Sequence, residues 1–170
     1  MNIKDELISI RRDIHQNPEL GFEEYRTSKI IQEYLKKEGI DFKKKKKTGV
    51  CAEIRGEGRG KKVIALRADM DALPIEEKTD CEYKSKIKGK MHACGHDAHT
   101  AILLGAAKIL NKNKKYFSGT VKLLFEPAEE TTGGALIMIN EGVLKEPYVE
   151  RIVGLHVSED LDCGKIRVKL

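Results

Sequence analysis

The chain has 170 residues, of which 40% are hydrophobic and 35% are charged. This length fits one domain with a substantial core, and the composition is typical of a globular protein with a strongly ionised surface. No apolar run approaches the ~20 residues of a membrane-spanning helix, and the first residues, "MNIKDELISIRRDIHQ", do not have the pattern of a secretory signal. We therefore expect a cytoplasmic protein with no membrane partner.

The net charge of +5 depends on the run of lysines at 43–47. A nucleic-acid site needs basic residues on a recognition element or interleaved with aromatic residues, and this chain has only five Tyr, four Phe and no Trp. The run is better interpreted as a solvated loop or an edge strand, where lysines discourage further strand pairing. We expect no nucleic-acid partner.

Two amphipathic helices are predicted at the start of the chain, over residues 3–15 and 24–38. Pro18 and Gly21 separate them, and Gly39 occupies the position of a glycine that ends a helix. The segment "GVCAEIRG" then has the pattern of a strand, and a glycine-rich turn connects it to "KKVIALRA". Together these two segments predict a β-hairpin.

Three short apolar runs follow, "VIAL" at 63–66, "VKLLF" at 121–125 and "RIVGL" at 151–155. Such runs are typical of central strands that are buried on both faces. Helical patterns lie between them, at 99–112 and 133–142. The alternation predicts an α/β fold, with a mostly parallel mixed sheet flanked by helices.

Each of these runs leads directly into ionisable residues. The carboxyl ends of parallel strands share one edge of a sheet, which is where open α/β folds bind ligands. The segment "MHACGHDAHT" at 91–100, predicted as a loop before a helix, could meet the same edge. The strand-end residues are Asp69 and Asp71, then Glu126, Glu129 and Glu130, and finally His156.

The residue types at this edge favour a metal site, since cysteine, histidine and carboxylate suit zinc, or manganese and cobalt where carboxylates dominate. Cys94 and His96 can face one point only on an irregular backbone, which Gly95 permits. Two adjacent glutamates repel each other unless they share a cation or a proton. One would bind metal while the other serves as general base, and the residues alone leave open which is which.

Other interpretations stay open for each residue taken singly. The Glu129–Glu130 pair could be a solvated helix start, and His156 could be a core residue at a strand end. His92 and His99 are better interpreted as neighbours of the site than as ligands. The joint pattern on alternating strands and helices favours the metal site.

At these residues the chain resembles a known family. The segments "RRDIHQNPELGFEE", "LRADMDALPI", "MHACGHDAHTA", "PAEE" with "GGA", and "GLHV" are similar, in order, to those of the amidohydrolases that include hippurate hydrolase. Auxin-conjugate hydrolases, N-acetyldiaminopimelate deacetylase and bacterial N-acyl-amino-acid amidohydrolases, some called carboxypeptidases, share them. The resemblance implies a zinc-peptidase-like catalytic domain with two divalent ions (Zn, Mn, Co or Ni), and a smaller inserted domain through which the protein forms a homodimer.

The resemblance also implies a role for each matching residue. The metal ligands would be Cys94, His96, Glu130 and His156, with the thiolate between the two ions. Glu129 would be the general base, and Asp71 would orient a ligand or the base. The role of Asp69 stays open.

The chain departs from the family pattern at two places and in length. Glu126 stands where relatives often have glutamine, and "SED" follows "GLHV" in place of the usual continuation. Residues 1–170 are expected to be the N-terminal segment of the catalytic domain, without the inserted dimerisation domain, a last histidine ligand or the substrate-carboxylate site. We therefore expect this chain alone to be nearly inactive and to bind metal weakly or at one site.

The leading hypothesis is metal-dependent hydrolysis of the amide bond of N-acyl-amino acids, a class of small-molecule substrate. A dipeptidase or carboxypeptidase with the same chemistry is the nearest alternative. A non-catalytic half-domain that binds metal or a partner chain is the second.

Overall fold

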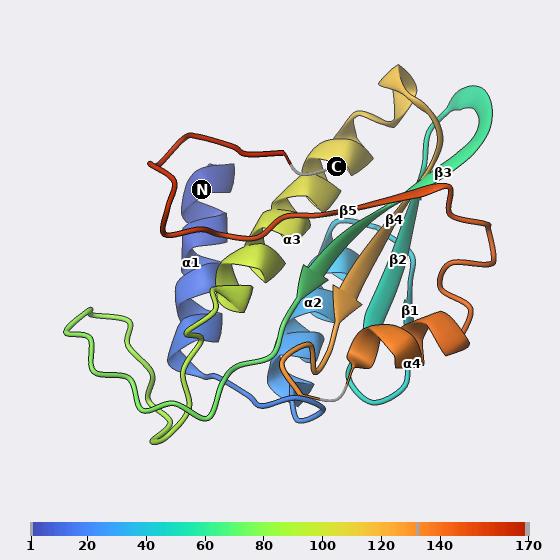
Figure 1. Cartoon of the computed structure of the whole chain (residues 1–170). Helices are drawn as coiled ribbons and strands as arrows, with labels where there is room; N and C mark the ends of the chain where they lie inside the picture. The colour runs from blue at the N-terminus through green and yellow to red at the C-terminus, as the bar shows by residue number, and fades with distance from the viewer. Residues whose placement is uncertain (1, 132, 169–170) are drawn as a thin grey trace.

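The computed structural model describes residues 2–131 and 133–168. Within these residues it contains five strands, four α-helices and one short 3-10 helix, and strands alternate with helices from β3 onward (Figure 1). In chain order the elements are α1 (Ile3–Gln16), α2 (Tyr25–Lys37), β1 (Phe42–Lys44), β2 (Val50–Arg55), β3 (Gly58–Asp69), α3 (His96–Lys112), η1 (Lys114–Tyr116), β4 (Ser118–Glu126), α4 (Gly134–Asn140) and β5 (Arg151–Gly154).

The first two helices agree with their predicted ranges to within two residues. The side chain of Asn2 accepts a hydrogen bond from the backbone N–H of Asp5 at 3.0 Å, which caps the start of α1. Gly39 follows the end of α2 with φ of 67°, the left-handed conformation that glycine adopts most easily.

The predicted hairpin is wrong, because β4 lies between the two strands that would form it. The sheet order is β1-β2-β4-β3-β5, so β2 pairs antiparallel with β4, while β3 pairs parallel with both β4 and β5. The glycine-rich turn instead crosses the beginning of β4, where the N–H of Gly56 donates to the carbonyl of Gly119 at 2.9 Å. A Cβ on Gly56 would lie 2.4 Å from the carbonyl oxygen of Phe117, so this close crossing requires glycine.

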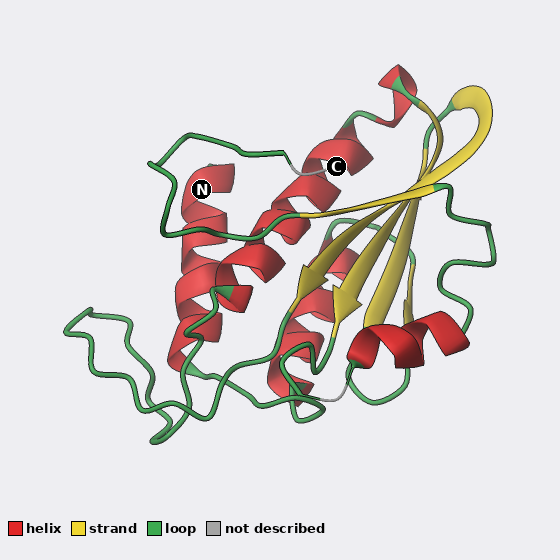
Figure 2. Ribbon diagram, viewed as in Figure 1, coloured by secondary structure: helices red, strands yellow, loops and turns green. Residues whose placement is uncertain are grey.

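Helices lie on both faces of the sheet, which confirms the α/β class and the mixed sheet flanked by helices (Figures 1 and 2). The prediction that 63–66 is buried on both faces is wrong for Ile64 of β3, which is 38% exposed. The larger core lies on the side of α2 and α3, where Leu35 and Leu104 pack with Leu123 and Phe125 of β4. A smaller core on the opposite face joins Met138 of α4 to the sheet. No helix in the described part of the chain is long and apolar enough to cross a membrane.

The two edges of the sheet differ from its centre. β4 is buried along nearly its whole length, as predicted. The prediction that 151–155 is also buried on both faces is wrong, because β5 is an edge strand and Ile152 and Val153 are 53% and 56% exposed. At the other edge, β1 contains Lys43 and Lys44 with exposed side chains, which confirms the edge-strand interpretation of the lysine run.

Candidate metal centre

The end of β3 lies beside the beginning of α3. The carboxylates of Asp69 and Asp71 therefore lie next to the "HACGHDAH" segment. α3 begins at His96, three residues earlier than predicted, which places His96 and His99 in its first turn. Gly95 precedes it with φ of 83°. This left-handed residue lets Cys94 and His96 face one point, as the sequence predicts, and a side chain at 95 would meet Val157 at 2.5 Å.

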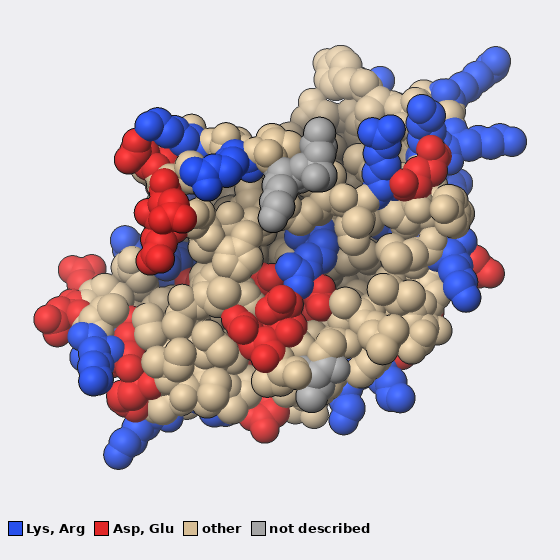
Figure 3. Space-filling model, in the orientation of Figure 1, with Lys and Arg blue, Asp and Glu red and all other residues tan. Residues whose placement is uncertain are grey.

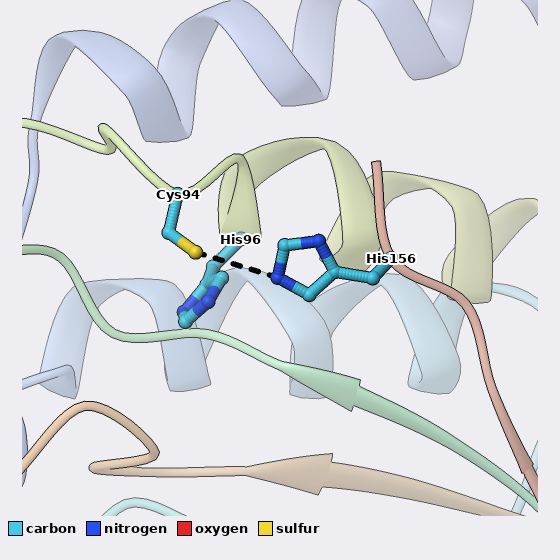
Figure 4. Close-up of side chains that lie close together, drawn as sticks. All are labelled: Cys94, His96 and His156. Carbon is cyan, nitrogen blue, oxygen red and sulfur yellow. Dashed lines mark hydrogen bonds between the residues drawn. The ribbon is translucent and has the colours of Figure 1, made fainter. Parts of the chain in front are cut away.

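One group of potential ligands consists of Cys94, His96 and His156, whose donor atoms all lie within 4.8 Å of one another. Figure 4 shows the three side chains converging from the start of α3 and from the segment after β5. The thiol sulfur of Cys94 is 3.3 Å from Nε2 of His156. Nδ1 of His156 lies 2.7 Å from the carbonyl of Val157, to which it can donate, and this tautomer leaves Nε2 free to bind a metal.

A second group, His96 with Glu129 and Glu130, shares His96 with the first. Nε2 of His96 lies 3.7 Å from Oε1 of Glu130, and it has no hydrogen-bond partner within the described ranges although the side chain is 1% exposed. A buried nitrogen without a partner calls for an explanation, and a metal ion between the two groups supplies one. The donor set therefore fits a divalent metal.

Asp71 holds two of these residues in place. Its Oδ1 lies 3.1 Å from Nδ1 of His96, and its Oδ2 accepts the backbone N–H of Glu130 at 3.0 Å. A carboxylate on the far nitrogen of a histidine fixes the tautomer in which Nε2 faces the metal. Asp71 thus contacts one predicted ligand directly and the backbone of another.

Asp69 and His99 connect the buried strand end to the segment after β5. Oδ1 of Asp69 is 2.6 Å from Nδ1 of His99, and Nε2 of His99 accepts the backbone N–H of Val157 at 2.9 Å. Both ring nitrogens of His99 are therefore engaged within the protein, as expected of a neighbour and not of a ligand. His92 is also buried, and burial lowers its pKa to about 4.

Arg67 offsets part of the acidic charge of the site. Its guanidinium lies 2.6 Å from Glu126, 2.6 Å from Asp69 and 3.9 Å from Glu129. Figure 3 shows acidic side chains gathered beside basic ones in the middle of this face. Glu126 also accepts the backbone N–H of Ala135 at the start of α4. This carboxylate is thus paired, and it links the sheet to α4.

The field of the site is negative. Partial burial raises the pKa of the Cys94 thiol to about 11, with the hydrogen bond and charge of Glu130 adding to the effect. Burial alone would lower the pKa of His96, but its hydrogen bond to Asp71 and the charge of Asp69 outweigh burial and raise it. Both shifts have causes that a bound cation would oppose, because it favours a thiolate and a neutral imidazole.

Sequence reasoning did not find Glu24 and Arg67. Glu24 is fully buried, and its carboxylate accepts the backbone N–H of Ala128 at 2.8 Å and the hydroxyl of Thr48. Ala128 has φ of 51°, so Glu24 holds the strained turn that precedes Glu129. The only signal was the acidic "GFEE" segment, and nothing in its spacing connects residue 24 with residue 128.

Known proteins are similar to this chain in sequence and fold. The chain is 52% identical over 166 residues to thermostable carboxypeptidase 2 of Saccharolobus solfataricus, covering 95% of this chain and 42% of the relative. It is 49% identical over 168 residues to the N-acetyl-L-cysteine deacetylase of Bacillus subtilis, covering 98% and 40%. The chain therefore spans less than half the length of these curated relatives.

The crystal structure of the Bacillus subtilis YXEP protein, described as a dinuclear metal binding peptidase from the M20 family, has a TM-score of 0.93 and 47% identity. The similarity covers 98% of this chain and 47% of that one. The model of peptidase family M20/M25/M40 matches residues 65–170, which is more than half of the chain and includes every predicted site residue. On this evidence, the chain belongs to peptidase family M20/M25/M40.

Proposed function

We propose that this chain supplies the metal ligands Cys94, His96, Glu130 and His156 to a centre of two divalent ions. The observation that carries the proposal is the buried Nε2 of His96, which has no hydrogen-bond partner in the described residues. His96 belongs to three groups of potential ligands: one with Cys94 and His156, one with Glu129 and Glu130, and one with Asp69 and His99. Nitrogen, sulfur and carboxylate donors suit zinc, while manganese, cobalt and nickel are the alternatives. Two ions bound here would polarise a substrate carbonyl and make a water more acidic.

Glu129 is proposed as the general base. Its side chain is 39% exposed, and its nearest charged partner is Arg67 at 3.9 Å, so it is held loosely and faces the open side of the site. A carboxylate in this position can accept a proton from the attacking water and later give it to the leaving amine. Asp71 keeps His96 and the backbone of Glu130 in position while the proton moves.

The proposed substrates are N-acyl-amino acids, because the deacetylase relative by its name acts on such a compound. The carboxypeptidase relative favours the alternative, in which a peptide is cleaved by the same chemistry. We extend the proposal to a cytoplasmic protein in which residues 1–170 are the N-terminal segment of the catalytic domain. In this proposal, a domain inserted into the catalytic domain joins two copies of the protein into a homodimer.

Metal analysis tests the ligand assignment directly. We expect Cys94→Ala to lower the number of bound zinc ions per chain, and Glu130→Gln to lower zinc occupancy. Glu129→Gln should leave metal content nearly unchanged, because a base is not a ligand. Full zinc content in Cys94→Ala would overturn the proposal, and the opposite behaviour of the two glutamine variants would exchange their roles.

Activity is tested by fusing this chain to the remaining part of the Bacillus subtilis deacetylase. The fusion protein would be given N-acetyl-L-cysteine, other N-acetyl and N-benzoyl amino acids, and dipeptides. Glu129→Gln should lower the rate by ~10²-fold to 10⁴-fold. A correctly folded, metal-loaded fusion protein that cleaves none of these compounds would support the alternative of a half-domain that binds metal without catalysis.

A further inference from the structure

A separate group of potential metal ligands lies at the end of α1, where α1 meets the long loop between β3 and α3. The donor atoms of His15, Glu77 and Cys81 all lie within 4.8 Å of one another. His15 belongs to α1, while Glu77 and Cys81 belong to the loop, which extends beside the end of α1 in Figure 1. None of these three residues is part of the centre proposed above.

Two distances within this group are close to the edges of a zinc tetrahedron. Nε2 of His15 lies 3.2 Å from Oε1 of Glu77, and the same oxygen lies 3.8 Å from the sulfur of Cys81. Zinc bonds of ~2.1 Å to nitrogen and oxygen and ~2.3 Å to sulfur give edges of about 3.4 and 3.6 Å at tetrahedral angles. A carboxylate and a thiolate would also neutralise the charge of the ion.

The surrounding residues orient these ligands as they do in zinc sites. Nδ1 of His15 lies 2.9 Å from the buried carboxylate of Asp97, which leaves Nε2 to face Glu77. Nε of Arg11 donates to the same oxygen of Asp97, Oδ2, at 2.7 Å. The second oxygen of Glu77 accepts the backbone N–H of Ser85 at 2.6 Å. A carboxylate, a histidine and a metal in series is a common arrangement in metal sites.

The group opens on a cavity of about 700 Å³ that leaves room for a fourth ligand. His92 lines the same cavity at 4% exposure, and neither of its ring nitrogens has a hydrogen-bond partner among the described residues. Its ring centre is 6.3 Å from that of His15. A buried histidine without partners beside three donor atoms is a second sign that the cavity receives a polar ligand or an ion.

We propose that His15, Glu77 and Cys81 bind a single zinc ion, separate from the dinuclear centre. The ion connects α1 to a loop that contains no helix or named strand between Asp69 and His96. The same cavity is lined by Cys94 and His156, so the ion stabilises a wall of the space beside the dinuclear centre. The contrasting explanation is a hydrogen-bonded anchor, in which Glu77 only accepts from Thr79, Cys81, Ser85 and His15.

Cobalt(II) titration of residues 1–170 distinguishes the two explanations, because a cobalt–thiolate bond has a characteristic charge-transfer absorption in the near ultraviolet. The experiment uses a Cys94→Ser background, which removes the thiolate of the dinuclear centre. We expect this protein to show the band at one cobalt per chain. Zinc should displace the cobalt and abolish the band.

In that background, Cys81→Ser should abolish the band, while the matched control Cys163→Ser should retain it. Glu77→Gln should weaken cobalt binding, and Asp97→Asn should weaken it by ~10-fold to 100-fold. Zinc should raise the melting temperature of the Cys94→Ser protein more than that of Cys94→Ser/Cys81→Ser. Circular dichroism in the absence of metal checks that each variant is folded.

The proposal is overturned if folded Cys94→Ser protein shows no thiolate–cobalt band, or if the band persists after Cys81→Ser. An equal effect of zinc on the melting temperature with and without Cys81 would also overturn it. Each of these results would identify the group as a hydrogen-bonded anchor of the loop.

Discussion

The two sides of the candidate metal centre are built differently. On the inner side, Asp69, Asp71, His96 and His99 are each at most 2% exposed and are connected by hydrogen bonds between the strand ends and α3. On the outer side, His156 follows an exposed edge strand and is itself exposed. Its side chain contacts the Cys94 thiol and the adjacent backbone carbonyl.

This difference has a physical cause. Charged groups are buried only where partners compensate the loss of water, so the inner residues are fixed when the protein folds. The outer residues remain hydrated and need no such framework. Changes on the inner side should therefore affect the free energy of unfolding, and changes on the outer side should affect metal binding.

Asp71→Ala should have the largest effect on stability. It leaves the buried Nδ1 of His96 and the backbone N–H of Glu130 without their shared acceptor. We expect the free energy of unfolding to fall by about 3–5 kcal/mol in urea titrations with a chelator present. Asp160→Ala, at an exposed position, is the control. If Asp71→Ala lowered the free energy of unfolding as little as Asp160→Ala does, the hydrogen bonds of the inner side would not stabilise the fold.

Glu24→Ala should have the next largest effect, because it removes the acceptor for Ala128 and Thr48. We expect a loss of about 1–3 kcal/mol in the same urea titrations. Glu24→Gln keeps one acceptor oxygen and should lose less. If Glu24→Gln and Glu24→Ala lost the same free energy of unfolding, the hydrogen bond from Ala128 to Glu24 would not contribute to the stability of the protein.

The contribution of His15 should depend on pH. The hydrogen bond to Asp97 raises the pKa of His15 above its ordinary value near 6.5, although burial opposes this. A raised pKa contributes stability that is fully present below the unfolded value and is lost as pH rises through the folded value. The stability difference between wild type and His15→Gln, measured without metal, should therefore shrink from pH ~6 to pH ~9. A difference that grows over this range would contradict the assignment.

His156→Ala should have the smallest effect on stability, within ~0.5 kcal/mol, since its side chain is exposed. Zinc affinity should nevertheless fall by at least ~10-fold, because removing a metal ligand should weaken binding at least as much as removing a residue that orients a ligand. Chelator competition measures the affinity, and urea titration measures the stability. Loss of stability without loss of affinity would reverse the distinction between the two sides.

Local sequence determined the parts that depend on near neighbours. The apolar spacing in α1 and α2 defines one face of each helix, so both ranges could be predicted. The convergence of Cys94 and His96 follows from the glycine between them, whose left-handed backbone needs no distant contact. The strand-end positions of Asp69 and Asp71 follow from the apolar run before them. The roles proposed for the two glutamates depend on family resemblance, because adjacent carboxylates are chemically equivalent in the sequence.

Only the tertiary structure decided which distant segments meet. Val50–Arg55 pairs with β4 instead of β3, because β4, buried along nearly its whole length, occupies the centre of the sheet. Arg151–Gly154 is as apolar as a central strand but lies at an edge, and its pattern alone does not specify what covers it. The contact between Glu24 and Ala128 joins residues 104 positions apart. Such pairings result from competition among all segments for burial and for hydrogen-bond partners, and no local pattern records that competition.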